Sequence, residues 1–371
     1  MSHGVYVHIP WCRRRCPYCA FYVEADHGVP WDRFTGALTR EHEARRPAYG
    51  GLGKTLYLGG GTPSRMPLPQ LQALVHALGG QADEITIEAN PEDIDGDWLT
   101  AVRGAGVTRL SLGLQTFNPR YARMLNRNAT VEQARAIAGE VARAGFTSWS
   151  VDLIFALPGQ TLDELAVDLD AILATEPPHV SLYGLTYEPG TPFARARDRG
   201  TFTPASDDTW RRMYDLLVDR MARAGLARYE VSNFARVGHR SHHNQGYWTH
   251  RPYMGLGPSA HGLEPGGARY VNDPDATAYI DGAVAPCTTE HPDARTEALD
   301  RLAGGLRGVE GLDLRLLGEA TGWGVQGPVV DALVGHGLLD RLGATIRLTD
   351  DGFPVADSVV TRLARALQRT T

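Results

Sequence analysis

The stretch Tyr6-Val-His-Ile-Pro-Trp-Cys12-Arg-Arg-Arg-Cys16-Pro-Tyr-Cys19 holds three of the four cysteines in the chain. The C-x3-C-x2-C spacing on one tight loop lets three thiolates converge on one inorganic cluster. A four-iron cluster normally takes four thiolates, so a set of three leaves one iron open to a reacting ligand. We therefore assign Cys12, Cys16 and Cys19 as the ligands of a [4Fe-4S] cluster.

Two other uses of clustered cysteines fit this sequence less well. A zinc site usually needs a second pair of ligands, and no further C-x2-C pair follows. A disulfide framework is unexpected in a chain of 371 residues with four cysteines and no recognisable signal peptide. The remaining cysteine, Cys287, stands alone, and we interpret it as a buried, inert thiol.

Composition indicates a globular protein with one large domain and a smaller one. The hydrophobic fraction is 43% over 371 residues, and no apolar run is long enough to span a membrane. The net charge of −6 argues against a nucleic-acid partner, since phosphate backbones favour clustered positive charge. The three arginines Arg13 to Arg15 interrupt this pattern. They either balance the charge of a cluster or substrate or form a solvated surface. An exposed cluster suits a reducing, cytoplasmic compartment.

Strand-like and helix-like stretches alternate over about the first 200 residues, which implies a parallel sheet. Six such units are too few for an eightfold barrel. We therefore expect an α/β fold with a partial (β/α)6 barrel of the TIM type, whose functional residues lie at the carboxyl ends of the strands. The expected strands are 4–9, 55–59, 84–88, 109–114, 148–154 and 180–185, and the clearest expected helices are 69–78, 131–144, 162–174 and 206–224.

Residues that can bind a ligand or take part in a reaction follow five of these strands. The cysteine loop follows the first strand and Gly59-Gly60-Gly61-Thr62 follows the second. Glu88 ends the third strand, Gln115 the fourth and Asp152 the fifth. Because the carboxyl ends of parallel strands meet at one edge, these side chains are expected to share one site.

The last part of the chain has a different pattern. Short helical segments lead to a hairpin over 339–348 and a final helix over 354–367, which predicts a small, winged-helix-like unit. We expect residues 1–265 to form the barrel with an extension, and residues 266–371 to form this C-terminal domain. Asp350, Asp351 and Asp357 argue against DNA binding by the winged helix.

Taken together, these motifs resemble the radical S-adenosylmethionine (SAM) superfamily, in the branch of oxygen-independent coproporphyrinogen III oxidase. The motifs that carry the resemblance are Tyr6-Val-His-Ile-Pro, Gly59-Gly-Gly-Thr-Pro-Ser64, Gly113-Leu-Gln115-Thr-Phe117, Asp152-Leu-Ile-Phe-Ala-Leu-Pro158-Gly-Gln-Thr161 and Tyr187-Glu-Pro-Gly-Thr-Pro192. The resemblance implies that the open iron of the cluster binds SAM and that one electron cleaves it to a 5′-deoxyadenosyl radical. It also implies a reductant such as flavodoxin or ferredoxin, and a small-molecule or peptide substrate.

The resemblance assigns further residues to the SAM site. The glycine run lets backbone approach the methionyl ammonium without a Cβ in the way, and Thr62 and Tyr6 belong to the same motifs. Glu88 and Asp152 are suited to the ribose hydroxyls and the cationic end of SAM. The amide of Gln115 both donates and accepts. Arg127 matches the arginine that binds the carboxylate of SAM.

Within this branch, two interpretations remain. Phe21 stands where the decarboxylating oxidase carries a further cysteine, so porphyrinogen decarboxylation is discounted. We favour a C-methyltransferase that uses two SAM molecules to methylate an sp2 carbon of a natural product or peptide. The alternative is a haem chaperone, supported by the segment His243-Asn244-x-x-Tyr247-Trp248, in which the imidazole of His243 is a natural axial ligand. A structural histidine is the plain alternative for His243.

The methyltransferase interpretation depends on departures from the chaperone pattern. They border the predicted mouth of the barrel, where a substrate would lie. These departures are Ala20, Phe155-Ala156, Asn126-Arg127-Asn128-Ala129 and Pro258-Ser259.

Overall fold

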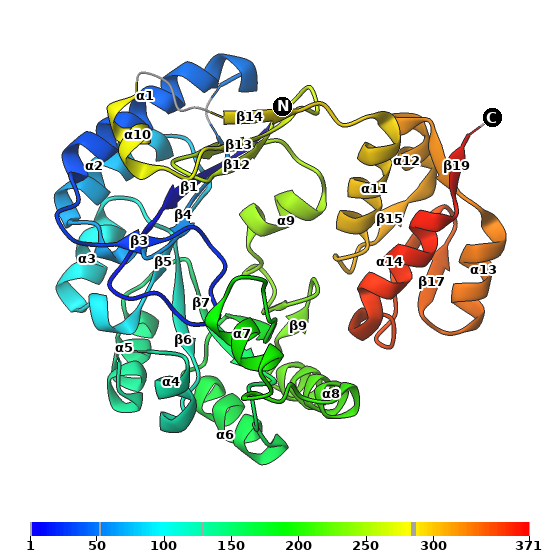
Figure 1. Cartoon of the computed structure of the whole chain (residues 1–371), viewed down its shortest axis with the longest axis horizontal. Helices are drawn as coiled ribbons and strands as arrows, with labels where there is room; N and C mark the ends of the chain where they lie inside the picture. Colours follow the sequence, from blue (N-terminus) through cyan, green and yellow to red (C-terminus); the bar gives the residue numbers. More distant parts are fainter. Residues whose placement is uncertain (1, 52, 128, 283–286, 371) are drawn as a thin grey trace.

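The computed structural model describes residues 2–51, 53–127, 129–282 and 287–370 (Figure 1). Its centre is a partial barrel of six parallel strands, as predicted, and each strand begins and ends within one residue of its expected position. In their order across the sheet, the strands are β1 (Gly4–Ile9), β4 (Thr55–Gly60), β5 (Glu84–Ala89), β6 (Arg109–Gln115), β7 (Ser148–Phe155) and β8 (His179–Gly184).

Side chains along these strands point alternately outward and inward, which separates a hydrophobic outer layer from a polar interior. In β1, for example, Val5, Val7 and Ile9 are fully buried in the hydrophobic core, whereas Tyr6 and His8 bond to each other. Helices cover the outer face (Figure 1). The long ones are α1 (Trp31–Tyr49), α2 (Leu68–Gly79), α3 (Gly96–Gly104), α5 (Val131–Arg143), α6 (Leu162–Leu173) and α8 (Asp207–Arg223).

Helix α6 begins as its sequence predicts. The hydroxyl of Thr161 accepts a hydrogen bond of 3.1 Å from the backbone N–H of Glu164, whose carboxylate accepts one of 2.9 Å from the N–H of Thr161. Shorter helices lie in the connections. They are α4 (Pro119–Met124), α7 (Pro192–Asp198), α9 (His242–Trp248), α10 (Ala276–Asp281) and the single turns η1 (Pro63–Arg65), η2 (Pro91–Asp93) and η3 (Phe353–Val355).

Further strands extend the sheet at both edges to twelve in the described part of the chain. Beside β1 lie β11 (Tyr253–Leu256), which is parallel to it, and the antiparallel strands β12 (His261–Leu263), β13 (Arg269–Asn272) and β14 (Cys287–Glu290). Beyond β8 lie β10 (Asn233–Ala235) and β9 (Ala227–Arg228), and the short strands β2 (Trp11–Cys12) and β3 (Glu24–Ala25) pair separately.

The extension continues past residue 265, where the sequence predicts the domain boundary. Buried Glu41 of α1 accepts hydrogen bonds from Asn272 (2.8 Å) and Tyr279 (2.6 Å), which ties this segment to the barrel. We therefore propose that the boundary follows Glu290. Cys287 is exposed on β14, so its interpretation as a buried thiol is wrong. All four residues of this edge strand are exposed, which a lone cysteine in the sequence could not reveal.

The C-terminal unit, residues 294–370, has the predicted winged-helix character. Helices α11 (Ala294–Gly305), α12 (Leu314–Thr321) and α13 (Gly327–Gly335) precede a hairpin of β17 (Leu339–Leu342) and β18 (Thr345–Leu348), which pairs with β15 (Leu312–Asp313). Helix α14 (Ala356–Arg365) and the pair β16 (Trp323–Val325) and β19 (Leu367–Arg369) complete the unit. None of the helices in the described ranges is both long and apolar enough to cross a bilayer.

Candidate functional site

A cavity of about 790 Å³ opens at the carboxyl ends of the barrel strands. Segments that follow all six strands contribute to its wall, which is the edge the sequence predicts for the site. Among the predicted residues, the wall contains Cys16, Cys19, Gly60, Gly61, Thr62, Glu88, Gln115, Arg127 and Asp152.

The cysteine loop lies beside this cavity. The backbone N–H of Cys19 donates to the carbonyl of Cys16 at 3.2 Å, so the loop turns tightly between them. Cys12 accepts a hydrogen bond of 3.2 Å from the hydroxyl of Thr62. Burial raises the pKa of the Cys12 thiol to about 11. All three thiols are free and only partly buried.

Within the described ranges, no group of three thiol, imidazole or carboxylate side chains is arranged to hold a metal ion. The assignment of the three cysteines to a cluster therefore depends on their spacing along one loop beside the cavity. The guanidinium of Arg127 lies 3.9 Å from the sulfur of Cys16, and Arg13 and Arg14 line the same cavity, so positive charge lies beside the cysteine loop.

Three ion pairs hold the loop in place. Arg65 donates to Asp26 at 2.7 Å, beyond the last cysteine, and lies 3.2 Å from Asp93. Asp93 also pairs with Arg13, between the first and second cysteines, at 3.2 Å. Asp93 therefore joins both ends of the loop to the segment after β5.

The glycine run has a packing role in addition to the predicted one. A Cβ on Gly61 would lie 2.7 Å from the carbonyl of Pro10, just before the cysteine loop. Gly60 has a φ of +107°, and a Cβ there would lie 2.5 Å from the His8 ring. These glycines therefore let the end of β4 approach the start of the cysteine loop.

Glu88 lies inside the barrel and is held by two donors. Tyr57 donates to one carboxylate oxygen at 2.8 Å and the backbone N–H of Gly60 to the other at 3.2 Å. Burial and the nearby carboxylate of Asp152 raise the pKa of Glu88 to about 7, against the lowering effect of the two donors. A bound cation would favour the ionised form.

Asp152 and Gln115 occupy neighbouring strand ends. The hydroxyl of Ser111 donates to Asp152 at 3.0 Å and that of Ser150 at 3.4 Å, while burial raises the pKa of the carboxyl. Gln115 sits at a bulge where the pairing of β6 with β7 shifts by one residue, and its φ is 68°. The bulge turns Gln115 toward the cavity, a use of bulges common beside binding sites.

Part of the Arg127 guanidinium is already hydrogen-bonded to other groups of the protein. One nitrogen of its guanidinium donates to the carbonyl of Gly113 at 2.6 Å and to the side chain of Asn90 at 2.5 Å. The other terminal nitrogen faces the cysteine loop. Its predicted role as a carboxylate ligand therefore depends on the half of the guanidinium that faces Cys16.

Four predicted residues are not part of the cavity wall: Cys12, Gly59, Tyr6 and His243. Tyr6 bonds through its hydroxyl to His8 at 3.0 Å, and His8 bonds in turn to the carbonyl of Tyr22 at 2.9 Å, so Tyr6 supports the cysteine loop indirectly. His243 is 3% exposed and lies at the opposite ends of the strands. Its ring nitrogens are 2.9 Å from the hydroxyl of Thr55 and 2.8 Å from that of Tyr247, so both are occupied.

Sequence reasoning did not select Ser111, which lines the cavity wall. Ser111, Gly113 and Gln115 alternate with leucines in β6, and this small or polar inward pattern is the signal that could have found Ser111.

The departures on which the methyltransferase interpretation depends do not gather at one place. Ala20 and Asn126 line the cavity, whereas Phe155-Ala156 and Pro258-Ser259 are outside its wall and Asn128 lies outside the described residues. Phe21, which replaces a cysteine of the oxidase, is 66% exposed at the rim.

Comparison with known proteins places the chain in a family. The model of the radical SAM superfamily matches residues 6–172. The haem chaperone HemW of Mycobacterium tuberculosis is 36% identical over 97% of this chain and 94% of its own length. The HemW proteins of Lactococcus lactis and Bacillus subtilis are each 32% identical, over 96% and 94% of this chain and 96% of their own lengths. The structure of coproporphyrinogen III oxidase from Escherichia coli has a TM-score of 0.82 at 22% identity over 98% of this chain and 90% of its own, which shows the shared fold.

These relatives overturn the methyltransferase interpretation. The chain matches proteins named haem chaperones along nearly its full length, so the expectation of a C-methylating enzyme is wrong, and the second SAM molecule belonged to that expectation alone. These few departures carried less information than similarity over the whole chain. The predicted superfamily and branch are confirmed: the chain belongs to the HemW-like branch of the radical SAM superfamily.

Proposed function

We propose that this protein is a haem chaperone that also binds a [4Fe-4S] cluster and SAM. The observation that carries the proposal is the match to HemW of M. tuberculosis over 97% of the chain. The cavity supports it, because cysteines, the glycine run and inward carboxylates share one wall.

The cluster would be held by Cys12, Cys16 and Cys19, with SAM beside it. Glu88 and Asp152 would face the cationic and ribose parts of SAM, Gln115 would bond to its polar edges, and Arg127 would bind its carboxylate. When bound, the cluster supplies one electron to the sulfonium of SAM, and the protein supplies orientation.

A reductant such as flavodoxin or ferredoxin would deliver that electron. Arg13, Arg14 and Arg15 are exposed on the cysteine loop, where they would attract an acidic electron carrier. A cytoplasmic location would keep the thiols reduced.

Haem is the proposed cargo, and His243 is its candidate axial ligand. The imidazole could bind iron only after releasing Thr55 or Tyr247, since both ring nitrogens are hydrogen-bonded. Haem binding would then involve a rearrangement around α9.

A haem titration of anaerobically reconstituted protein tests the proposal. We expect saturable uptake with a new Soret band in the wild type. His243→Gln should weaken it at least tenfold, whereas the matched variant His242→Gln, at the exposed neighbouring position, should behave as wild type. Absence of saturable uptake, or formation of S-adenosylhomocysteine from SAM, would refute the chaperone function.

The triple variant Cys12→Ala, Cys16→Ala, Cys19→Ala tests the cluster site. It should lose the brown colour and the bound iron. Its far-UV circular dichroism should be unchanged, because the pairs of Arg65 with Asp26 and Asp93 do not involve the thiols. Retention of stoichiometric iron would contradict the assignment.

A further inference from the structure

The C-terminal unit contacts the barrel through pairs of opposite charge, always with the same polarity. Within the described ranges, four ion pairs join the two, and each takes its arginine from the barrel side and its acid from the unit. They are Arg211–Asp351, Arg228–Asp350, Arg240–Glu310 and Arg269–Asp300.

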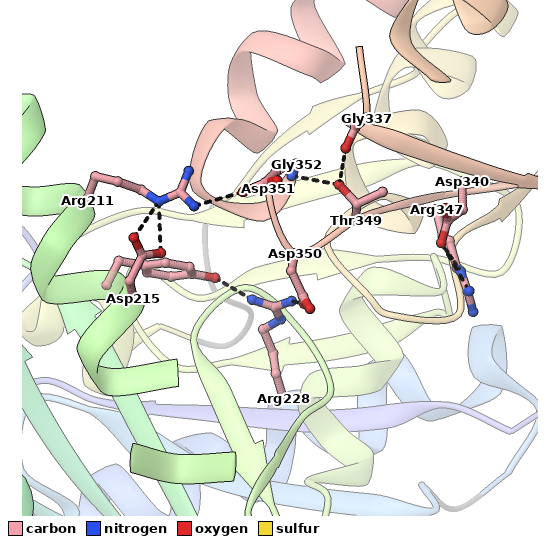
Figure 2. Close-up of polar contacts among 11 residues, drawn as sticks. Arg211, Asp215, Arg228, Gly337, Asp340, Arg347, Thr349, Asp350, Asp351 and Gly352 are labelled. Atoms are coloured by element: carbon pink, nitrogen blue, oxygen red, sulfur yellow. Dashed lines mark hydrogen bonds and ion pairs between the residues drawn. The ribbon is translucent and has the colours of Figure 1, made fainter. Parts of the chain in front are cut away.

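Figure 2 shows two of these pairs, in which Arg211 and Arg228 reach the turn after β18. Arg228 also lies over the ring of Phe353, at 3.9 Å, and donates to the hydroxyl of Tyr214 at 2.9 Å. The acids themselves remain exposed, with side-chain exposures of 91% for Asp350 and 70% for Asp351. Exposed pairs of this kind contribute little to stability, and salt weakens them.

Inside this rim, the contact combines backbone pairing with one buried polar atom that has no partner. Glu230 pairs with Gly308, and the N–H of Val309 donates to the carbonyl of Tyr229 at 3.2 Å. The Nε of Arg228, beside Phe353, makes no hydrogen bond. An unpaired buried polar atom costs desolvation free energy, which offsets part of the stability that this contact contributes.

The path of the chain permits the C-terminal unit to separate from the barrel. The chain leaves the large sheet once, between Glu290 and Ala294, and its described part does not return to that sheet. Helix α11 lies against α9, where a Cβ on Gly304 would be 2.9 Å from the carbonyl of Trp248. On its other side α9 lies against β4, through the bond of His243 with Thr55. The docked unit therefore clamps the segment that holds His243.

We propose that the C-terminal unit is a latch that holds α9 against the barrel, and that its release frees α9 and His243 to bind haem. The inference rests on the proposed function. Release would also leave Arg228 and Arg240 without their acidic partners, and guanidinium groups suit the two carboxylates of haem. In the closed form, Asp350 and Glu310 thus pair with cations that the cargo would use.

The test compares two double variants of the reconstituted full-length protein. Asp350→Arg with Asp351→Arg reverses the charges that face the barrel. The turn should remain intact, because Thr349 shapes it by bonding to Gly337 and Gly352 (Figure 2). The control, Asp331→Arg with Asp340→Arg, makes the same change in net charge at acids whose partners, Arg341 and Arg347, lie within the unit.

Two measurements follow the latch and the cargo separately. Hydrogen exchange of residues 242–248 should be at least tenfold faster in the Asp350/Asp351 variant, because the unit is released in a larger fraction of the molecules. For the same reason, the apparent Kd of this variant for haem should be at least threefold lower. The control should match the wild type in both.

Each other outcome decides against the inference. Unchanged exchange would show that these pairs do not hold α9 closed. Faster exchange with unchanged haem affinity would show that the latch does not gate the site, and would leave the chaperone function standing. If the wild type and both variants bind no haem, the proposed function itself fails, whatever the exchange shows.

Discussion

The hydroxyl of Tyr57 donates a hydrogen bond of 2.8 Å to the carboxylate of Glu88, in the interior of the barrel. The same ring stacks on His243, with centroids 5.0 Å apart and an angle of 28°. Tyr57 therefore connects the wall of the cavity with the α9 segment at the other end of the strands.

Tyr57→Phe should weaken SAM binding. A hydrogen bond to a charged group contributes about 1.5–3 kcal/mol, so the loss of the donor should reduce affinity roughly tenfold or more. Calorimetric titration of the reconstituted protein with SAM measures this. Tyr6→Phe is the matched control, because its hydroxyl bonds to His8 and not to Glu88. Equal losses in both variants would contradict the role of Tyr57.

SAM binding should also depend on pH through Glu88. Its pKa of about 7 means that the carboxyl is largely protonated at pH 6 and ionised at pH 8. Since the sulfonium favours the ionised form, affinity should rise between pH 6 and 8, by up to about tenfold per unit below the pKa. Glu88→Gln should lack this part of the rise. An identical pH profile in the variant would show that Glu88 does not sense the bound cation.

Gly61→Ala should disturb the cysteine loop. The added Cβ would lie 2.7 Å from the Pro10 carbonyl, and such overlap typically costs about 1–3 kcal/mol. We expect a lower urea midpoint and less than half the iron of the wild type after reconstitution. In Gly104→Ala the Cβ meets no atom within 4 Å, so that variant should keep its iron. Full iron in Gly61→Ala would show that the close approach is dispensable.

Acid should destabilise the protein partly through His243. Burial lowers its pKa to about 3, whereas the unfolded chain titrates near 6.5. The unfolded state therefore binds the proton first as pH falls, so the stability from this neutral histidine is present above pH 6.5 and is lost below it. At pH 5.5 the loss is about 1 kcal/mol.

Urea unfolding of the wild type and His243→Gln at pH 7.5 and 5.5 measures this term. The variant should be less stable at pH 7.5, because it loses the bonds to Thr55 and Tyr247, but should lose less on acidification. Glu88 and the other buried histidines contribute equally to both proteins and cancel in the comparison. If both proteins lose the same free energy of unfolding between pH 7.5 and 5.5, the proton that destabilises the fold binds to a group other than His243.

The contact between the latch and the barrel shows the limit of reading charges from sequence. In the sequence, Asp350 and Asp351 indicate only that the winged helix carries acidic charge. Their partners, Arg211 and Arg228, lie more than 100 residues earlier, and nothing local in the sequence joins them.

His243 shows the same limit for function. Its segment indicated a haem ligand, yet the structure surrounds the ring with Thr55, Tyr57 and Tyr247. The departures at Phe155 and Pro258 suggested a substrate pocket, but those residues are outside the cavity wall. Position in the chain indicates which strand end a residue follows, and does not tell which side chains surround it.

The sequence by itself determined the barrel and the place of the site. Period-two strands, capped helices and the spacing of Cys12, Cys16 and Cys19 are local patterns, and each is governed by residues a few positions apart. Only the tertiary structure decided that Glu88 is held by Tyr57, that His243 is masked and that the C-terminal unit is docked by its acids. These features depend on contacts between distant segments, whose burial sets the pKa values and the available hydrogen bonds.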